Sequence, residues 1–456
     1  MKRLPFKNDS VFLLVALTVI SLFLRLAFLS KGPYNVDCLD FAIKSEELLT
    51  TGRLQTSGPG YPLFILLGAV FIGAARMFSI HDPVIGVNVM SAFFGAMSVG
   101  ALFVLLQNLL NRTAAFFGAV MLSVFPICLA ESTYGKNHTA SLFFLLAGLA
   151  ALASFQTTGR KRAFISAATL LGAMGATRIQ DLPWIMPAVT VLFFWPPGET
   201  GRVPATPFLN RLKLFTLMIT IAASVMAVLH LPFILGTGRG NYLGYFAKSW
   251  DIGVTANFRG LISPSLLSSL VILVCGLTPV GFLLSILGTG KLAVKNRRVF
   301  YFLLTWLVFT LGFFGNLAGT TSRYLLIPAV PLIIAQSYLM GTLWQSRSRL
   351  IRYGAGLTFV FIILLLFSQT YPILQFRHRF APMVDFSYFV RDNTAPNAVI
   401  IASDEGWFIR YYAEREPLKR PDYPAPPGYP GLPRRIGQGS GGRTSGLHDP
   451  FRNLQL

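Results

Sequence analysis

Runs of apolar residues separated by short polar loops dominate the chain from residue 10 to residue 372. The runs are roughly 16 to 26 residues long, and about 20 apolar residues are enough for a helix to cross the hydrocarbon core of a membrane. A helix satisfies its backbone hydrogen bonds internally, as that core requires. The pattern therefore predicts an all-α polytopic membrane protein.

The composition supports this prediction. Of the 456 residues, 53% are hydrophobic and 12% are charged, whereas about 25% of the residues in an ordinary soluble domain are charged. The formal net charge of +21 would indicate a nucleic-acid partner in a soluble protein. Here the basic residues cluster in short loops that determine membrane topology, so no nucleic-acid partner is expected.

The basic loops predict which ends of the apolar runs are cytoplasmic. Loops at 160–162, 291–298 and 347–352 contain no acidic residue, and the basic loop at 199–213 contains only one. The N-terminus is predicted to be cytoplasmic and to lead into an uncleaved signal anchor. Because successive spans must alternate in direction, segment 61–79 cannot cross the membrane once and is predicted to be re-entrant or interfacial. About eleven spans remain. They are 11–29, 84–109, 115–130, 140–156, 163–178, 183–195, 214–235, 263–288, 299–318, 324–344 and 353–372.

Three domains are predicted along the chain. Residues 1–375 form the transmembrane domain. Residues 376–416 form a small periplasmic α/β segment, with a strand at 399–401 and a helix or second strand at 407–412. Residues 417–456 are rich in Pro, Gly and Arg, which predicts disorder.

Unusual polar residues gather on the predicted outer face. Asp37 and Asp40 lie in the first outer loop, where they either solvate the loop or do chemistry. A charged residue at the centre of a membrane helix costs roughly 2.5 to 3.5 kcal/mol, so charge near a span usually marks function. Further candidates are Arg25, Lys136, His138, Arg178, Asp181, Arg323 and Tyr324.

Several candidates also have an ordinary structural explanation. Arg25 can extend its side chain to the interface, and Arg178 and Asp181 can pair as i, i+3 neighbours. Lys136 can be an ordinary loop charge, and His138 can be a hydrogen-bonded interfacial histidine. The convergence of these residues on one face is therefore stronger evidence for a site than any single residue.

Short motifs follow one another in a characteristic order. Asp37 precedes Phe41 and Ala42, then Leu-Leu-Thr-Thr-Gly at 48–52 and Gly-Tyr-Pro-Leu at 60–63. Later, Arg178 follows a span rich in small residues, and Arg-Tyr-Leu-Leu-Ile-Pro occupies 323–328. In order and sidedness, these motifs resemble the GT-C glycosyltransferases of the protein O-mannosyltransferase and lipid A aminoarabinose transferase type. The resemblance covers about residues 10–375 and implies the GT-C fold.

Two positions depart from the pattern of that family. Cys38 stands where the family often has Glu, and Asn137-His138 stands where the second outer loop often has Asp. Carboxylates suit Mg²⁺ or Mn²⁺, whereas a thiol does not. No cofactor is therefore expected to be required, and a divalent metal is possible but unsupported.

The resemblance implies an inverting transfer of a sugar from a polyprenyl-phosphate donor to a hydroxyl of a lipid, glycan or protein acceptor. Asp37 is the expected general base, with Asp40 second, and basic side chains stabilise the leaving phosphate. The site is expected on the periplasmic or extracellular face of a bacterial inner membrane. The expected substrate-binding residues are Arg25, Tyr61, Lys136, His138, Arg178, Asp181, Arg323 and Tyr324.

Two other classes of function remain open from the sequence. A transporter or lipid flippase of cell-envelope glycolipids would need polar residues near the bilayer midplane and two related halves. The polar residues here lie at predicted outer ends, and no internal repeat is visible. A non-catalytic partner in polysaccharide assembly is the third possibility. An enzyme predicts an outer cavity lined by Asp37 and Arg178, whereas a transporter predicts a pathway that reaches both faces.

Overall fold

The computed structural model describes residues 8–56, 60–195, 207–237, 257–318, 321–402 and 406–419, together with Tyr242, Gly244 and Ala247. The disordered tail predicted beyond residue 419 and much of the outer loop predicted at 236–262 lie outside these residues. The chain divides into two compact units, Met1–Phe380 and Ala381–Leu456. The boundary lies after Phe380 because helix α16 continues without a break to Arg379.

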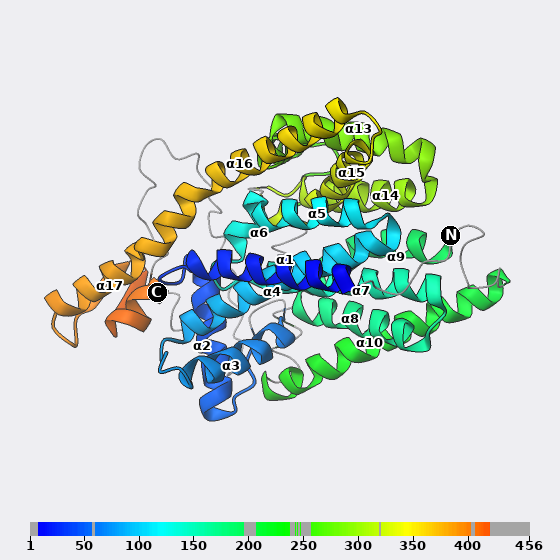
Figure 1. Cartoon of the computed structure of the whole chain (residues 1–456). Helices are drawn as coiled ribbons and strands as arrows, with labels where there is room; N and C mark the ends of the chain where they lie inside the picture. The colour runs from blue at the N-terminus through cyan, green and yellow to red at the C-terminus, as the bar shows by residue number, and fades with distance from the viewer. Residues whose placement is uncertain are drawn as a thin grey trace. The chain divides into compact units, whose positions relative to one another are not determined.

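The first unit is built of helices that run alongside one another (Figure 1). Helix α4 packs against α1, α5 and α7, while α15 packs against α5 and α13. The bounds are α1 Asn8–Ala27, α2 Val36–Thr51, α3 Pro62–Arg76, α4 Pro83–Leu109, α5 Arg112–Val124, α6 Pro126–Glu131, α7 Asn137–Thr158, α8 Lys161–Thr177, η1 Ile179–Asp181, α9 Leu182–Phe194, α10 Phe208–Thr237, α12 Pro264–Leu277, α13 Pro279–Lys295, α14 Arg297–Phe314, η3 Ser322–Leu325, α15 Leu326–Trp344 and α16 Arg349–Arg379.

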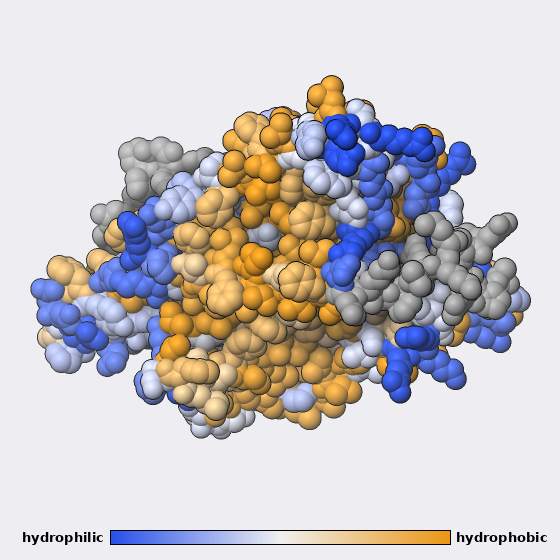
Figure 2. Space-filling view, in the orientation of Figure 1, coloured by the Kyte–Doolittle hydropathy of each residue, from blue (hydrophilic) through white to orange (hydrophobic). Residues whose placement is uncertain are grey.

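Apolar helices of membrane-spanning length confirm the predicted class of fold. Within the described residues, 7 helices are long and apolar enough to cross a membrane, or up to 8 if α12 and α13 count as one span. The remaining predicted spans correspond to the shorter helices α5, α8 and α9. Figure 2 shows a broad apolar belt across the middle of the visible face.

Two predicted spans are interrupted in the structure. Segment 263–288 is not one helix: α12 and α13 meet at an angle of 100° at Thr278, whose φ is 65°. Segment 115–130 is likewise divided at Phe125 into α5 and α6. A proline follows each break, at Pro279 and Pro126, and the ring of proline disfavours helical backbone in the preceding residue.

Helix α2 carries the two acidic candidates. Asn35 caps it by accepting a hydrogen bond from the Cys38 N–H (3.0 Å), and Gly52 ends it in the left-handed conformation with φ 69°. One face of α2 is buried and packs against α3 and α4. Asp37 and Asp40, three residues apart, share another face of the helix.

The second unit is a small α/β structure. Strand β1 Val399–Ala402 confirms the predicted strand and pairs in parallel with β2 Glu416–Lys419. The segment predicted at 407–412 as a helix or second strand is helical, because it lies in α18 Gly406–Phe408 and η4 Ile409–Ala413. Helix α17, Pro382–Asn393, packs against η4.

Candidate active site

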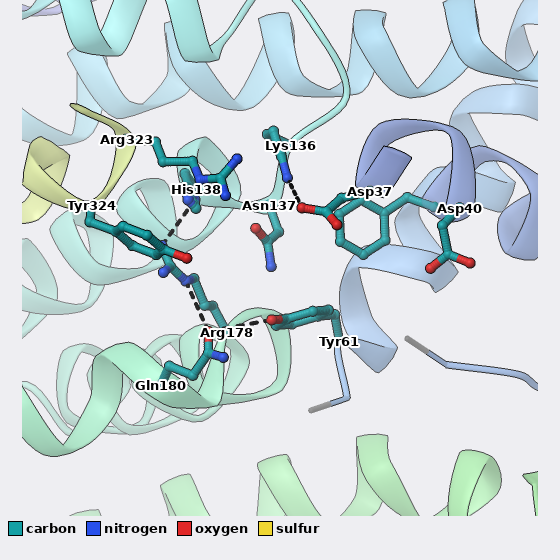
Figure 3. A pocket seen from close by; sticks show the side chains of 11 residues that line it. Asp37, Asp40, Tyr61, Lys136, Asn137, His138, Arg178, Gln180, Arg323 and Tyr324 are labelled. Carbon is teal, nitrogen blue, oxygen red and sulfur yellow. Dashed lines mark hydrogen bonds and ion pairs between the residues drawn. The ribbon is translucent and has the colours of Figure 1, made fainter. Parts of the chain in front are cut away.

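A polar pocket of about 460 Å³ brings together residues from distant parts of the first unit (Figure 3). They come from α2, from the residue before α3, from the start of α7, from the end of α8 with η1, and from η3. The lining residues are Asp37, Asp40, Phe41, Tyr61, Lys136, Asn137, His138, Arg178, Gln180, Arg323 and Tyr324.

Asp37 forms an ion pair with Lys136 across the pocket. The Lys136 side chain is only 3% exposed, whereas the Asp37 side chain is 58% exposed. Burial raises the pKa of Asp37, but the nearby positive charges of Lys136, Arg323 and Arg178 outweigh it and leave that pKa below its ordinary value. The pocket therefore holds an ionised carboxylate that ligands can reach.

Asp40 lies one helical turn beyond Asp37 and has its own basic partner. The Lys44 amine lies 2.8 Å from an Asp40 carboxylate oxygen, as an i, i+4 ion pair on α2. The Asp40 carboxylate lines the pocket, whereas Lys44 does not. One edge of the pocket therefore carries a negative charge that Lys44 balances from outside it.

Arg178 directly follows the last residue of α8 and contacts several other side chains. Its Nε lies 3.4 Å from Asp181 and 3.4 Å from the Gln180 side-chain oxygen, and its guanidinium carbon lies 5.3 Å from the centre of the Tyr324 ring. Its Nη1 is 2.9 Å from His138 Nδ1. The arginine is 4% exposed, so these contacts fix its position in the pocket wall.

The contact with Arg178 determines the role of His138. A guanidinium can only donate, so Nδ1 of a neutral His138 accepts and Nε2 carries the proton. Nε2 makes no hydrogen bond within the described part of the chain, although the histidine is buried. His138 can therefore offer a hydrogen bond to a ligand without acting as a base.

Aromatic rings form the rest of the wall. The Tyr61 hydroxyl donates to the Gln180 side-chain oxygen (3.3 Å), and the Phe41 and Tyr61 rings meet edge to face with centroids 5.6 Å apart. The Arg323 guanidinium packs over the Tyr324 ring at 5.3 Å. These contacts orient polar groups from separate elements towards one space (Figure 3).

Two predicted substrate-binding residues do not line the pocket. Asp181 is buried behind it, where it pairs with Arg178 and accepts a hydrogen bond from the Ser141 hydroxyl (2.7 Å). Arg25 is fully buried between helices and contacts Ser21 and the Cys128 sulfur (3.6 Å). The Arg25 guanidinium does not line the cavity, and its role in binding substrate stays a prediction.

Asn137 and Gln180, like Phe41, line the pocket but were not predicted as site residues. Both adjoin predicted residues in the same loops, beside His138 and near Arg178, and this adjacency was the available signal. Cys38, which replaces an expected acid, is fully buried and faces away from the pocket towards Asn88 (3.6 Å). The departure from the family pattern therefore places no thiol in the site.

The pocket does not offer a metal site of the usual kind. Among the described residues, no group of three or more His, Cys, Asp and Glu side chains is arranged to hold a metal ion. The carboxylates of Asp37 and Asp40 contact Lys136 and Lys44, whose amines repel a cation.

Comparison with solved structures identifies the fold. ArnT from Cupriavidus metallidurans, solved with undecaprenyl phosphate, matches with a TM-score of 0.63 at 13% identity over 91% of this chain and 87% of that chain. The oligosaccharyltransferase of Archaeoglobus fulgidus, solved with a tethered acceptor peptide, matches with a TM-score of 0.59 at 14% identity over 91% of this chain. The match covers 64% of that enzyme, so this chain spans less than two thirds of its length. The fold is that of the GT-C glycosyltransferases.

A family model supports the same class from sequence. The model described as dolichyl-phosphate-mannose-protein mannosyltransferase matches residues 67–233. No curated protein shows significant sequence similarity to the chain. The family match and the fold confirm the resemblance to GT-C glycosyltransferases.

Proposed function

We propose that this protein transfers a sugar from a polyprenyl-phosphate donor to an acceptor hydroxyl and inverts the anomeric centre. The observation that carries this proposal is the ionised Asp37 beside Lys136, Arg178 and Arg323 in one pocket. A reaction of this kind needs a base for the acceptor and fixed positive charge for the leaving phosphate. Both requirements meet in that pocket.

The cationic side supports a role in binding the phosphate. Three cationic side chains line the pocket: Arg178, Arg323 and Lys136. Of the two carboxylates that line it, Asp40 is paired with Lys44 on its own helix, which leaves Asp37. Guanidinium groups bind phosphate oxygens with two parallel hydrogen bonds, and the interaction strengthens as negative charge develops. His138 Nε2–H adds a neutral donor to the same wall.

The proposed step is a single displacement. The acceptor oxygen attacks the anomeric carbon, its proton passes to the Asp37 carboxylate, and a new glycosidic bond forms. The bond from the anomeric carbon to the phosphate oxygen breaks, and its electron pair leaves with the polyprenyl phosphate. Arg178 and its cationic neighbours stabilise the charge on that leaving group.

The lipid nature of the donor is inferred from the setting of the pocket. ArnT was solved with undecaprenyl phosphate, and the archaeal oligosaccharyltransferase was solved with a dolichol-phosphate. A prenyl chain would lie against the apolar helices while its phosphate reaches the cations. By the distribution of basic loops, we place this pocket on the periplasmic face of a bacterial inner membrane, with the N-terminus cytoplasmic.

We further propose that transfer requires neither a cofactor nor a divalent metal. Lys136 already neutralises the Asp37 carboxylate, and Lys44 neutralises Asp40. Treatment with EDTA should leave the transfer rate unchanged within twofold. Loss of activity that returns with Mg²⁺ or Mn²⁺ would contradict this proposal.

The test of the function is release of free polyprenyl phosphate in proteoliposomes. A panel of polyprenyl-phosphate sugars would be supplied with crude membrane acceptors to wild type and to Asp37→Asn. Asp392→Asn is a matched control, because Asp392 is an exposed carboxylate of the second unit. Release by wild type and the control but not by Asp37→Asn supports the proposal. Equal release by Asp37→Asn, or none by folded wild type with any donor, contradicts it.

A further inference from the structure

The two groups on which the proposed reaction depends come from separate segments. Asp37 lies in the first turn of α2 and Lys136 immediately precedes α7, 99 positions later in the chain. No short stretch of chain connects these two segments, so connectivity alone does not keep them together. The ion pair between them therefore requires a structure that fixes the segment around residues 30–38 against the segment around residues 133–136.

Asn88 on α4 contacts both segments with one side chain. Its Nδ2 donates to the Ser30 carbonyl (3.1 Å), and its Oδ1 accepts from the Gly135 N–H (2.7 Å). The Cys38 thiol lies 3.6 Å from the same Oδ1. Asn88 thus contacts Ser30 before Asp37, Cys38 directly after it, and Gly135 directly before Lys136. It is fully buried, so no solvent competes for these bonds.

Ser91, one turn further along α4, holds the Lys136 backbone. Its hydroxyl accepts from the Lys136 N–H (3.0 Å) and donates to the Lys136 carbonyl (3.2 Å). The Ser30 N–H donates directly to the Thr133 carbonyl (2.9 Å), which ties the two segments together again. One face of α4 therefore sets the backbone position from which the lysine extends.

The fit at Gly135 shows how close this contact is. A Cβ at Gly135 would lie 2.7 Å from a Val87 methyl carbon, 2.9 Å from the Cys38 sulfur and 3.4 Å from Asn88 Oδ1. Real Cβ atoms almost never approach other atoms below 3.0 Å. Only glycine lets this loop lie against α4 and α2 without displacement.

We infer that Asn88 is a positioning residue for the proposed transfer: it holds the Asp37 and Lys136 segments in the register that forms their ion pair. Neither Asn88 nor Ser91 lines the pocket, so this role is exerted through backbone position and not through contact with substrate. The inference depends on the proposed function only for its effect on rate. Its effect on the geometry of the pair stands separately.

Three variants test this role. Asn88→Ala removes the bridge from the α4 side, and Gly135→Ala displaces the loop from the other side. Ser98→Ala is the matched control, because Ser98 is also fully buried on α4, and its bonds to the Phe94 carbonyl (2.8 Å) and the Thr139 carbonyl (3.3 Å) lie outside both segments. If Asn88→Ala does not fold, Gly135→Ala carries the test.

The first readout needs no activity. An amine-acetylating reagent would be applied to the full-length protein in nanodiscs, and acetylation of Lys136 would be measured by mass spectrometry against the exposed Lys161. Lys136 should be protected in wild type and Ser98→Ala, since its side chain is 3% exposed. It should become at least fivefold more reactive in Asn88→Ala and Gly135→Ala. Unchanged protection in both variants would overturn the inference.

The second readout is kinetic. Misplacement of a reacting group by about 1 Å costs on the order of 100-fold in rate, so kcat should fall about 10- to 100-fold in both variants while the KM for donor changes less than threefold. The acid limb of kcat/KM should move to higher pH as Asp37 loses its lysine, a shift that reduced folding alone would not produce. The charged and titratable groups that line the pocket around Asp37 are Asp40 on α2, Tyr61 before α3, Lys136 and His138 at the start of α7, Arg178 after α8, and Arg323 and Tyr324 in η3.

The two readouts separate the two proposals. If folded wild type transfers no sugar, the proposed function fails, and the acetylation pattern still decides the role of Asn88. If wild type is active but both variants keep wild-type rates and the same acid limb, the positioning role fails while the function stands. Equal losses in Ser98→Ala would also overturn the inference, because any buried polar group on α4 would then have the same effect.

Discussion

Two buried arginines lie in very different surroundings, one in the pocket wall and one inside the helical bundle. Arg178 is 4% exposed, pairs with Asp181 and presents its guanidinium to the pocket beside His138. Arg25 is 0% exposed and finds Ser21, the Ser123 carbonyl and the Cys128 sulfur in place of a carboxylate. By sequence alone, both were predicted to bind substrate.

Burial of a charge inside a membrane protein does not by itself mark the site. An intramembrane arginine is costly in either place, so both positions attract a functional interpretation. What separates them is access to a cavity, together with other polar groups that converge on it. The predictions below strengthen or break this contrast between the pocket and the bundle interior.

Asp37→Asn should give the largest effect. Asparagine keeps the size of the side chain but cannot take a proton, and a positioned general base contributes roughly 10²- to 10⁴-fold. Release of polyprenyl phosphate should fall about 1000-fold while membrane insertion stays normal. Asp40→Asn is the matched variant on the same helix face, and it should lose less than tenfold. A dead Asp40→Asn with an active Asp37→Asn would reverse the assignment of the base.

Arg178→Ala should lower kcat by about 100-fold, since the loss of one fixed donor to a developing anion costs roughly 10²- to 10³-fold. Arg178→Lys should recover only part of the loss, because an ammonium cannot reproduce the planar fork. Steady-state kinetics with purified donor would measure both variants. Wild-type kinetics in Arg178→Ala would show that Arg178 does not act in the site. The proposed difference in function between Arg178 and Arg25 would then fail.

The pH dependence should change in Lys136→Met. The pKa of Asp37 lies below its ordinary value in the wild type, so Asp37 stays ionised in mildly acidic solution and activity falls only as the pH drops through that lowered pKa. Without Lys136, burial raises the pKa, and the ratio of activity at pH 5 to that at pH 7 should fall about tenfold. Lys44→Met, which removes the partner of Asp40, should leave this ratio unchanged. An unchanged ratio in Lys136→Met would show that Lys136 does not control Asp37.

Arg25→Met should give the smallest effect on activity, less than threefold per folded molecule. A flexible apolar side chain can fill most of the space that the arginine occupies, whereas Arg25→Ala should lose about 2 to 4 kcal/mol of unfolding free energy through the cavity it leaves. Thermal denaturation in detergent and the release assay would measure both properties. A large loss of activity in well-folded Arg25→Met would abolish the contrast between the two arginines.

Local sequence was a good guide wherever the property was itself local. The apolar runs located the helices, and the polar loops located Asp37, Lys136 and Arg178, all of which line the pocket. Prediction was poorer where proline divided an apolar run, as at Phe125 and Thr278, because hydropathy averages over such breaks. The pattern of apolar residues stays continuous across each break although the helix does not.

The membrane character, the helical class and the resemblance to GT-C glycosyltransferases could be predicted from the sequence, because they depend on composition and on short motifs in order. Which polar groups meet depends on the tertiary structure. Asp37 reaches Lys136 across 99 positions and Tyr61 reaches Gln180 across 119, while Arg25 turns into the bundle and Asn88 bridges two loops. Contacts between segments so far apart depend on helix packing, which no local pattern of residues records.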